Sequence, residues 1–151
     1  MKHYSFAFRT KDQALLGSVL NKMKDFKYSS VLLIDDSYID NLINRKIIEA
    51  SNFAEKITVI ESPFRAIDFL TESAGTQDAP DIIFLDIRMP GMNGFELVEQ
   101  LNEIKQKFYS DLKIYMLSSS LDPNDLKQVE DNDLVTNFIG KPLTTKVLEE
   151  I

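Results

Sequence analysis

The chain contains no cysteine, and its only histidine, His3, lies close to the N-terminus. The absence of cysteine excludes disulfides, thiol nucleophiles and thiolate metal sites within this sequence. A metal site in the rest of the chain would therefore consist of oxygen ligands, which hard cations prefer.

Positive charge is also scarce, because 17 lysines and arginines stand against 24 aspartates and glutamates, which gives a net charge of −7. Such a chain repels a phosphate backbone, so direct binding to nucleic acid is disfavoured. No segment approaches the ~20 apolar residues that a membrane span needs, and the first residues lack the apolar core of a signal peptide. We expect a cytoplasmic protein that binds neither nucleic acid nor membranes.

Length and composition are those of a globular domain: 151 residues, of which 44% are hydrophobic and 27% charged, without internal repeats. From Ser30 onward, short apolar runs alternate with segments of helical period, which is typical of βα units around a parallel sheet. The runs are 31–34, 57–60, 81–85, 113–117 and 137–139. We predict an α/β fold, a flavodoxin-like (βα)5 doubly wound parallel sheet with strand order 2-1-3-4-5.

Helical spacing predicts which side chains face the sheet. After the first run, the apolar stripe consists of Ile39, Leu42, Ile43, Ile47 and Ile48. Asn41 and Asn44 fall outside this stripe. After the second run, the inward face is predicted to consist of Phe64, Ile67 and Leu70.

Two later helices are predicted from their start signals. Asp122 followed by Pro123 is typical of an N-cap and first helical position, and the helix that they open has few apolar residues and is expected to be weakly anchored. The last helix is expected to begin after Pro142, near Thr144 or Thr145.

The first 29 residues form an extension to the domain predicted over 30–151. Tyr4, Phe6 and Phe8 alternate as in a strand. After a cap at Thr10, apolar residues recur with helical spacing: Leu15, Leu16, Val19, Leu20, Met23 and Phe26. The extension is either loosely packed or docks on the main domain or on a second copy, which would give a homodimer. Translation from Met23 would remove most of it.

Charged and polar side chains follow the predicted strands at the points where they end. Asp35 and Asp36 follow the first, Asp86 the third, Ser118 the fourth and Lys141 the fifth. The carboxyl ends of parallel strands meet at one edge of a sheet, called here the carboxyl edge, and ligands bind there. With strands one and three adjacent, the three acids are expected to share a pocket.

Three neighbouring carboxylates repel one another, which raises a pKa or requires a cation. Oxygen ligands without histidine or thiol favour Mg2+. Lys141 adds an ammonium, held by the following Pro142 in a peptide that is either trans or cis, and Ser118 adds a hydroxyl. Such groups around one carboxylate can receive phosphoryl oxygens, which makes Asp86 a candidate nucleophile. Each residue also has an ordinary explanation as a cap, turn or solvated charge, but their joint arrangement favours a site.

The segments "LLIDDS", "IIFLDIRMPGMNGFEL", "MLSSS" and "FIGKPL" together resemble the receiver domain of two-component response regulators, the CheY-like family. The resemblance covers Ser30 to Ile151. It implies that Asp86 accepts a phosphoryl group from a histidine kinase or a phosphotransfer protein. The receiver would catalyse only its own phosphorylation and dephosphorylation, and so would not be an enzyme with an external substrate.

The resemblance also implies roles for the remaining residues. Asp35 and Asp36 would bind Mg2+ together with Asp86 and the main-chain carbonyl of Arg88. Ser118 and Lys141 would bind the phosphoryl group, and Ser118 replaces a commoner threonine. The switch residues would be Ser118 and Phe138, the latter often a tyrosine. Arg88 and Ser120 occupy the positions that tune dephosphorylation.

Three other functions fit parts of this pattern. A Mg2+-dependent phosphohydrolase of the haloacid-dehalogenase type would need a second aspartate two residues after the nucleophile, where Arg88 stands, and a toprim-like nuclease fails on spacing too. A receiver-like binding module that is never phosphorylated is the remaining alternative, against which the complete acid, hydroxyl and lysine set argues.

Overall fold

The computed structural model describes residues 10–22, 24–108 and 111–151. Five parallel strands form one sheet in the order β2-β1-β3-β4-β5, which confirms the predicted fold. The strands are β1 (Tyr28–Ile34), β2 (Ala54–Ile60), β3 (Ile82–Asp86), β4 (Lys113–Ser118) and β5 (Asn137–Gly140). The helices are α1 (Thr10–Lys22), α2 (Tyr38–Ala50), α3 (Pro63–Ser73), α4 (Gly94–Ile104), α5 (Pro123–Glu130) and α6 (Thr145–Glu150), with a 3-10 turn, η1 (Lys105–Lys107).

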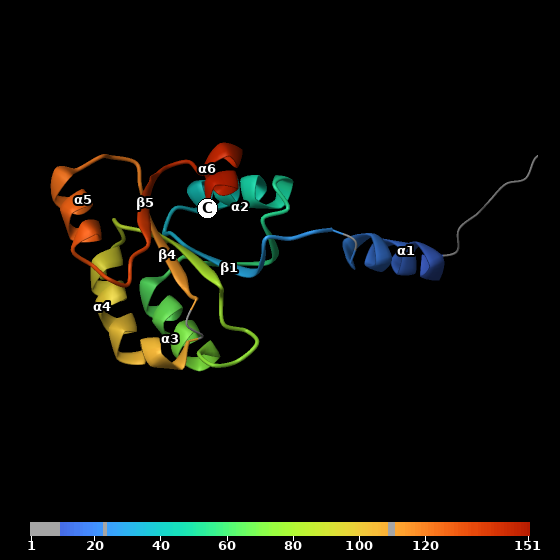
Figure 1. Ribbon diagram of the computed structural model, residues 1–151, viewed down its shortest axis with the longest axis horizontal. Helices are drawn as coiled ribbons and strands as arrows, with labels where there is room; N and C mark the ends of the chain where they lie inside the picture. The colour runs from blue at the N-terminus through green and yellow to red at the C-terminus, as the bar shows by residue number, and fades with distance from the viewer. Residues whose placement is uncertain (1–9, 23, 109–110) are drawn as a thin grey trace, which may run out of the picture.

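Helices cover both faces of the sheet, as Figure 1 shows, with α2 and α6 on one side and α3, α4 and α5 on the other. Successive side chains of a strand point to opposite faces. Leu32 and Ile34 therefore pack under α3 and α4, while Val31 and Leu33 pack under α2 and α6. This double cover explains why the strands read as continuous apolar runs. Within the described residues, none of the helices has the length and apolarity of a transmembrane segment.

The helices on the sheet begin with side-chain caps close to the carboxyl edge. Ser37 caps α2, Asn93 and Glu96 form a reciprocal capping box at α4, and Asp122 caps α5 ahead of Pro123. Thr144 caps α6, so both predicted helix starts are confirmed. Because each cap accepts a backbone N–H of the first turn, it fixes where the chain turns from strand to helix.

The predicted inward stripe of α2 is confirmed only in its second half, where Ile48 is buried and Ile47 packs against the core. The side chains of Asn41 and Asn44 are buried, whereas Ile39 is 65% exposed and Leu42 and Ile43 are exposed too. The buried amides satisfy backbone groups outside the helix: Asn41 Nδ2 donates to the Asp35 carbonyl at 2.7 Å, and Asn44 Oδ1 accepts from Leu143 N–H at 2.9 Å. Buried backbone groups without partners are costly, so these bonds outweigh apolar packing.

The predicted inward face of α3 needs a correction as well. Phe64 is exposed, and the helix buries Ala66 and Leu70, with Ile67 partly buried. The Phe64 ring lies against Gly91, where an added Cβ would be 3.0 Å from Cε2 of that ring. Gly91 has a φ of 81°, a left-handed conformation that glycine adopts without strain.

The extension contains α1, which projects away from the domain in Figure 1. Its side chains from Thr10 to Leu20 are all exposed. The helix ends at Lys22, so Phe26 lies beyond it in the segment that leads to β1. The strand predicted around Tyr4, Phe6 and Phe8 lies outside the described residues.

We predict that Asn44→Ala destabilises the protein by about 1–3 kcal/mol, because it leaves the Leu143 N–H buried without an acceptor. Ile39→Ala, on the exposed side of the same helix, is the matched control and should change the free energy of unfolding by about 0.5 kcal/mol or less. Urea unfolding of both variants measures the difference. A larger effect at Ile39 would reinstate the apolar stripe as the buried face.

Candidate functional site

Three carboxylates meet at the carboxyl edge of the sheet. One oxygen from each of Asp35, Asp36 and Asp86 lies within 4.8 Å of the others. Ile34 of β1 pairs with Leu85 of β3, so the residues that follow them come side by side. Asp35 is 1% and Asp86 4% exposed, whereas Asp36 faces solvent. The acids that the sequence predicted to meet therefore do so.

Lys141 places its ammonium among these acids. Its Nζ lies 2.6 Å from Asp35 Oδ2 and 3.1 Å from Asp86 Oδ1. The backbone N–H of Lys141 donates to the Ser118 carbonyl at 2.9 Å, which fixes the residue to the end of β4, and the Lys141–Pro142 peptide is cis. A single cation thus bridges the ends of β1 and β3.

Asp40 is a further partner of Lys141 that the sequence did not single out. Its Oδ2 accepts from Lys141 Nζ at 3.1 Å. The residue lies in the first turn of α2, where an acidic side chain is common because it suits the positive end of the helix dipole. Nothing in its spacing distinguished it from such an ordinary acid.

Burial and charge shift the pKa values of the central pair. Burial raises the pKa of Asp86 to about 6, the neighbouring Asp35 raises it too, and hydrogen bonds from Lys141 and from the Arg88 backbone oppose the rise. For Lys141, burial alone would lower the pKa, but the hydrogen bonds and charges of Asp35 and Asp86 outweigh it and raise the pKa above its ordinary value. The ammonium therefore stays charged and compensates the buried acids.

The residues present fit a small hard cation. Their ligand atoms are carboxylate oxygens, and the Arg88 carbonyl, the fourth expected ligand, belongs to the loop directly after β3. Asp35 is held in place because its Oδ1 accepts the Ser37 N–H at 2.9 Å. Asp36 makes no hydrogen bond or ion pair with another described residue, which leaves its carboxylate available.

Ser118 reaches the same edge, but its hydroxyl is directed to its own loop. It is the last residue of β4, next to the Asp86–Leu117 pair of the β3–β4 register. The Oγ donates to the Ser120 carbonyl at 2.9 Å and accepts the Ser120 N–H at 3.2 Å. Within the described part of the chain, the Ser118 hydroxyl makes no hydrogen bond with Asp35, Asp36, Asp86 or the Lys141 ammonium.

Gly94 lets α4 begin directly against the end of β3. Its N–H donates to the Ile87 carbonyl at 2.9 Å, and an added Cβ would lie 2.6 Å from the Asp86 carbonyl oxygen. No other residue fits this distance without moving the strand end that carries Asp86. Gly94 belongs to the motif that resembles the receiver family, but its close packing against the Asp86 carbonyl was not predicted.

Arg88 links the loop after β3 to α5. Its Nη2 lies 2.7 Å from Asp125 Oδ2 and 3.9 Å from Asp122 Oδ2. The Asp125 side chain is buried, and no motif or spacing predicted it as a partner of Arg88. Phe138, on β5 beside Met116, is partly buried against the core under α3, α4 and α5.

Comparisons with known proteins agree with this geometry. The family model described as "Response regulator receiver domain" matches residues 31–151. Two-component response regulator ORR6 of Oryza sativa subsp. japonica is 30% identical over 113 residues, 75% of this chain and 62% of that protein. Two-component response regulator ARR6 of Arabidopsis thaliana is 30% identical over 119 residues, 75% of this chain and 61% of that protein. The chain thus spans less than two thirds of the length of these relatives.

Solved structures show the same likeness. A two component response regulator from Cytophaga hutchinsonii is 40% identical with a TM-score of 0.77, over 82% of this chain and 93% of that one. A response regulator receiver protein from Dyadobacter fermentans is 29% identical with a TM-score of 0.72, over 81% of this chain and 93% of that one.

The raised pKa of Asp86 predicts a pH dependence of stability in metal-free buffer. The folded protein keeps the Asp86 proton up to about pH 6, whereas the unfolded chain loses it near 3.8. The folded state binds more protons between these values, so ionisation of Asp86 lowers the free energy of unfolding as the pH rises. Asp86→Asn cannot ionise. It should be more stable than the wild type near neutral pH, by a margin that shrinks toward about pH 4.

Urea unfolding with a chelator across this pH range measures the margin. Asp36→Asn, at the exposed acid of the same cluster, is the matched control and should change the free energy of unfolding much less. A margin that stays constant with pH would show that the ionisation of Asp86 is not its cause.

Proposed function

Because the chain belongs to the response regulator receiver domain family, we propose that Asp86 is the phosphoacceptor of a two-component phosphorelay. One observation carries the proposal: the Asp86 carboxylate lies at the carboxyl edge with a lysine ammonium 3.1 Å away and two further acids beside it. The donor would be a histidine kinase or a phosphotransfer protein. The cytoplasmic location expected from the sequence stays a prediction.

The proposed chemistry is transfer of a phosphoryl group onto Asp86. A carboxylate oxygen attacks phosphorus, the bond from phosphorus to the donor imidazole nitrogen breaks, and the imidazole keeps the electron pair and takes up a proton. Lys141 is already within reach of Asp86 and would neutralise charge on the phosphoryl oxygens. Mg2+, held by Asp35, Asp36, Asp86 and the Arg88 carbonyl, would supply further positive charge to the same oxygens.

Ser118 is the proposed link from the phosphoryl group to the protein surface. Its hydroxyl would leave the Ser120 carbonyl and donate to a phosphoryl oxygen, because phosphorylation adds about −1.5 to −2 charge and strong acceptors at that point. The loop after β4 would then move toward Asp86. Phe138, which is only partly buried, would fill the space that the loop vacates, and the surface of α5, β5 and α6 would change.

Arg88 gives a second proposed route to α5. It pairs with the buried Asp125 in this structure, and a phosphoryl group on Asp86 would compete for the same guanidinium. Loss of that pair would free the first turn of α5. Arg88 and Ser120 would in this way influence how long the phosphoryl group persists.

Incubation with Mg2+ and acetyl phosphate tests the proposed chemistry. We expect the intact mass of the wild-type protein to rise by one phosphoryl group and that of Asp86→Asn to stay unchanged. Lys141→Ala should fold but accept the group much more slowly, because it lacks the ammonium at the phosphoryl oxygens. No rise in the wild type, or an equal rise in Asp86→Asn, would favour the binding module that is never phosphorylated.

Hydrogen exchange tests the proposed switch. Mg2+ with beryllofluoride, a mimic of the phosphoryl group, should reduce amide protection in the first turn of α5 in the wild type. Asp125→Asn should show that reduction without beryllofluoride, since it weakens the contact with Arg88. Asp86→Asn with beryllofluoride is the control and should stay unchanged. Unaltered protection of α5 in the treated wild type would contradict the route through Arg88.

A further inference from the structure

The helix α1 presents an apolar face that no described part of the chain covers. Leu15, Leu16, Val19 and Leu20 are all large apolar side chains, and the least exposed of them is still 44% exposed. Their spacing of three and four residues places them on one side of the helix. Asp12 belongs to that side too, one turn toward the N-terminus. A helix of this length gains most of its stability from packing, so the face needs a partner.

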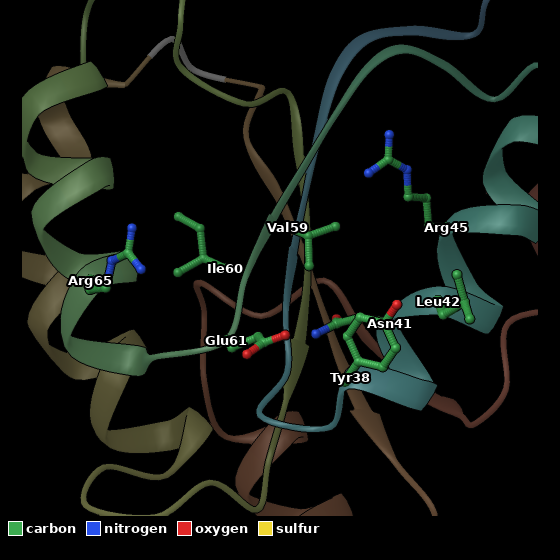
Figure 2. A pocket seen from close by; sticks show the side chains of 8 residues that line it. All are labelled: Tyr38, Asn41, Leu42, Arg45, Val59, Ile60, Glu61 and Arg65. Carbon is green, nitrogen blue, oxygen red and sulfur yellow. The ribbon is translucent and has the colours of Figure 1, made fainter.

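A groove runs between α2 and the edge strand β2, and apolar side chains that suit this face line its upper part. The hollow at the carboxyl edge, called here the upper hollow, has a volume of about 390 Å³. Leu42, Val59 and Ile60 line it, and Arg45 and Arg65 lie on either side, as Figure 2 shows. The lower hollow of the groove, of about 210 Å³, shares Arg45 and continues past Ile57. We call the two hollows together the α2–β2 groove. It remains open because β2 is the last strand of the sheet on this side.

The segment that leaves α1 already lies in the lower end of this groove. Lys24 and Phe26 line the lower hollow together with residues of α2 and β2. Residues 23–27, which join α1 to β1, reach at most about 17 Å when extended. The last turn of a docked α1 must therefore lie at the lower end.

The lengths of the helix and the groove agree. Both α1 and α2 have 13 residues, which corresponds to about 20 Å each. If the last turn of α1 lies at the lower hollow and the helix runs beside α2, the first turn of α1 reaches the upper hollow. Leu15, Leu16 and Val19 would then lie over Leu42 and Val59, which are incompletely buried in this structure.

The charges at the upper end agree with this direction. Asp12, in the first turn of α1, would approach Arg65, which makes no ion pair with any described side chain. Arg45, paired with Glu49 at 2.9 Å, is close by. Asn41 also lines the upper hollow, and its Oδ1 is buried without a hydrogen-bond partner. The hollow therefore offers cations for Asp12 and an acceptor for a polar first turn.

We propose that α1 docks in the α2–β2 groove of its own chain, with its apolar face on Leu42, Ile57 and Val59. The same chain is favoured over a second copy because Phe26 already lines the lower hollow and the connecting segment is short. The docked helix covers Tyr38, the first residue of α2, next to the loop that carries Asp35 and Asp36. The extension would then border the approach to the carboxyl edge.

The absence of cysteine makes a disulfide test direct. Leu16→Cys with Leu42→Cys places one thiol on the apolar face of α1 and one in the groove. Ala14→Cys with Leu42→Cys is the matched control, because Ala14 lies on the opposite side of α1. Both pairs are made in the full chain and oxidised gently at low protein concentration, and intact mass and non-reducing gels follow the reaction.

We expect the Leu16 pair to close within one chain about tenfold faster than the Ala14 pair, at a rate independent of protein concentration, since docking raises the effective concentration of only one thiol. Equal rates would overturn the proposal, because they indicate a free tether. A disulfide that joins two chains and speeds up with concentration would overturn it in favour of a second copy.

Hydrogen exchange on the unmodified chain gives an independent readout. Amides of α1 and of Ile57–Ile60 should be protected in the wild type, and Leu16→Asp should reduce protection in both segments. Ala14→Asp, on the opposite side, should leave both unchanged. A loss confined to α1 in Leu16→Asp, or an unprotected α1 in the wild type, would count against docking.

Discussion

The ion pairs of Lys141 are the interaction on which the rest of the site depends. Asp35 and Asp86 are buried side by side, and two ionised carboxylates in such a place repel each other and lose hydration. The ammonium 2.6 Å from one and 3.1 Å from the other makes the arrangement tolerable. It arrives from β5, so the two central acids depend on a residue more than fifty positions away in the sequence.

The parallel sheet supplies the geometry for this contact. The register of β1 with β3 brings Asp35 beside Asp86, and the hydrogen bond from Lys141 N–H to the Ser118 carbonyl brings the lysine over both. Gly94 then allows α4 to start against the Asp86 carbonyl, which closes the loop after β3 tightly. The strands are buried on both faces, so the positions of these polar groups are set by apolar packing beneath them.

The sequence predicted the site residues whose positions follow from the order of the strands. It did not predict the contacts that depend on where a side chain points. Acids at the ends of apolar runs had to meet once the strands were parallel, so Asp35, Asp36 and Asp86 were found. The first half of the α2 stripe was wrong because periodicity counts apolar residues and takes no account of irregular backbone that needs partners. Asn41 and Asn44 are buried for that reason. The partners Asp40 and Asp125 were missed since contacts between distant segments leave no local pattern.

The charge balance of the site explains why the same residues would suit a switch. One ammonium compensates two buried acids, while Asp36 remains without a partner among the described residues, so the cluster has a surplus of negative charge that a divalent cation would reduce. A phosphoryl group on Asp86 would return negative charge and add acceptors at one point. Two further donors, the Ser118 hydroxyl and the Arg88 guanidinium, are engaged with the loop after β4 and with α5. Recruiting the Ser118 hydroxyl to Asp86 would release the loop after β4, because a hydroxyl has one proton to donate. Drawing the Arg88 guanidinium toward Asp86 would weaken its contact with α5.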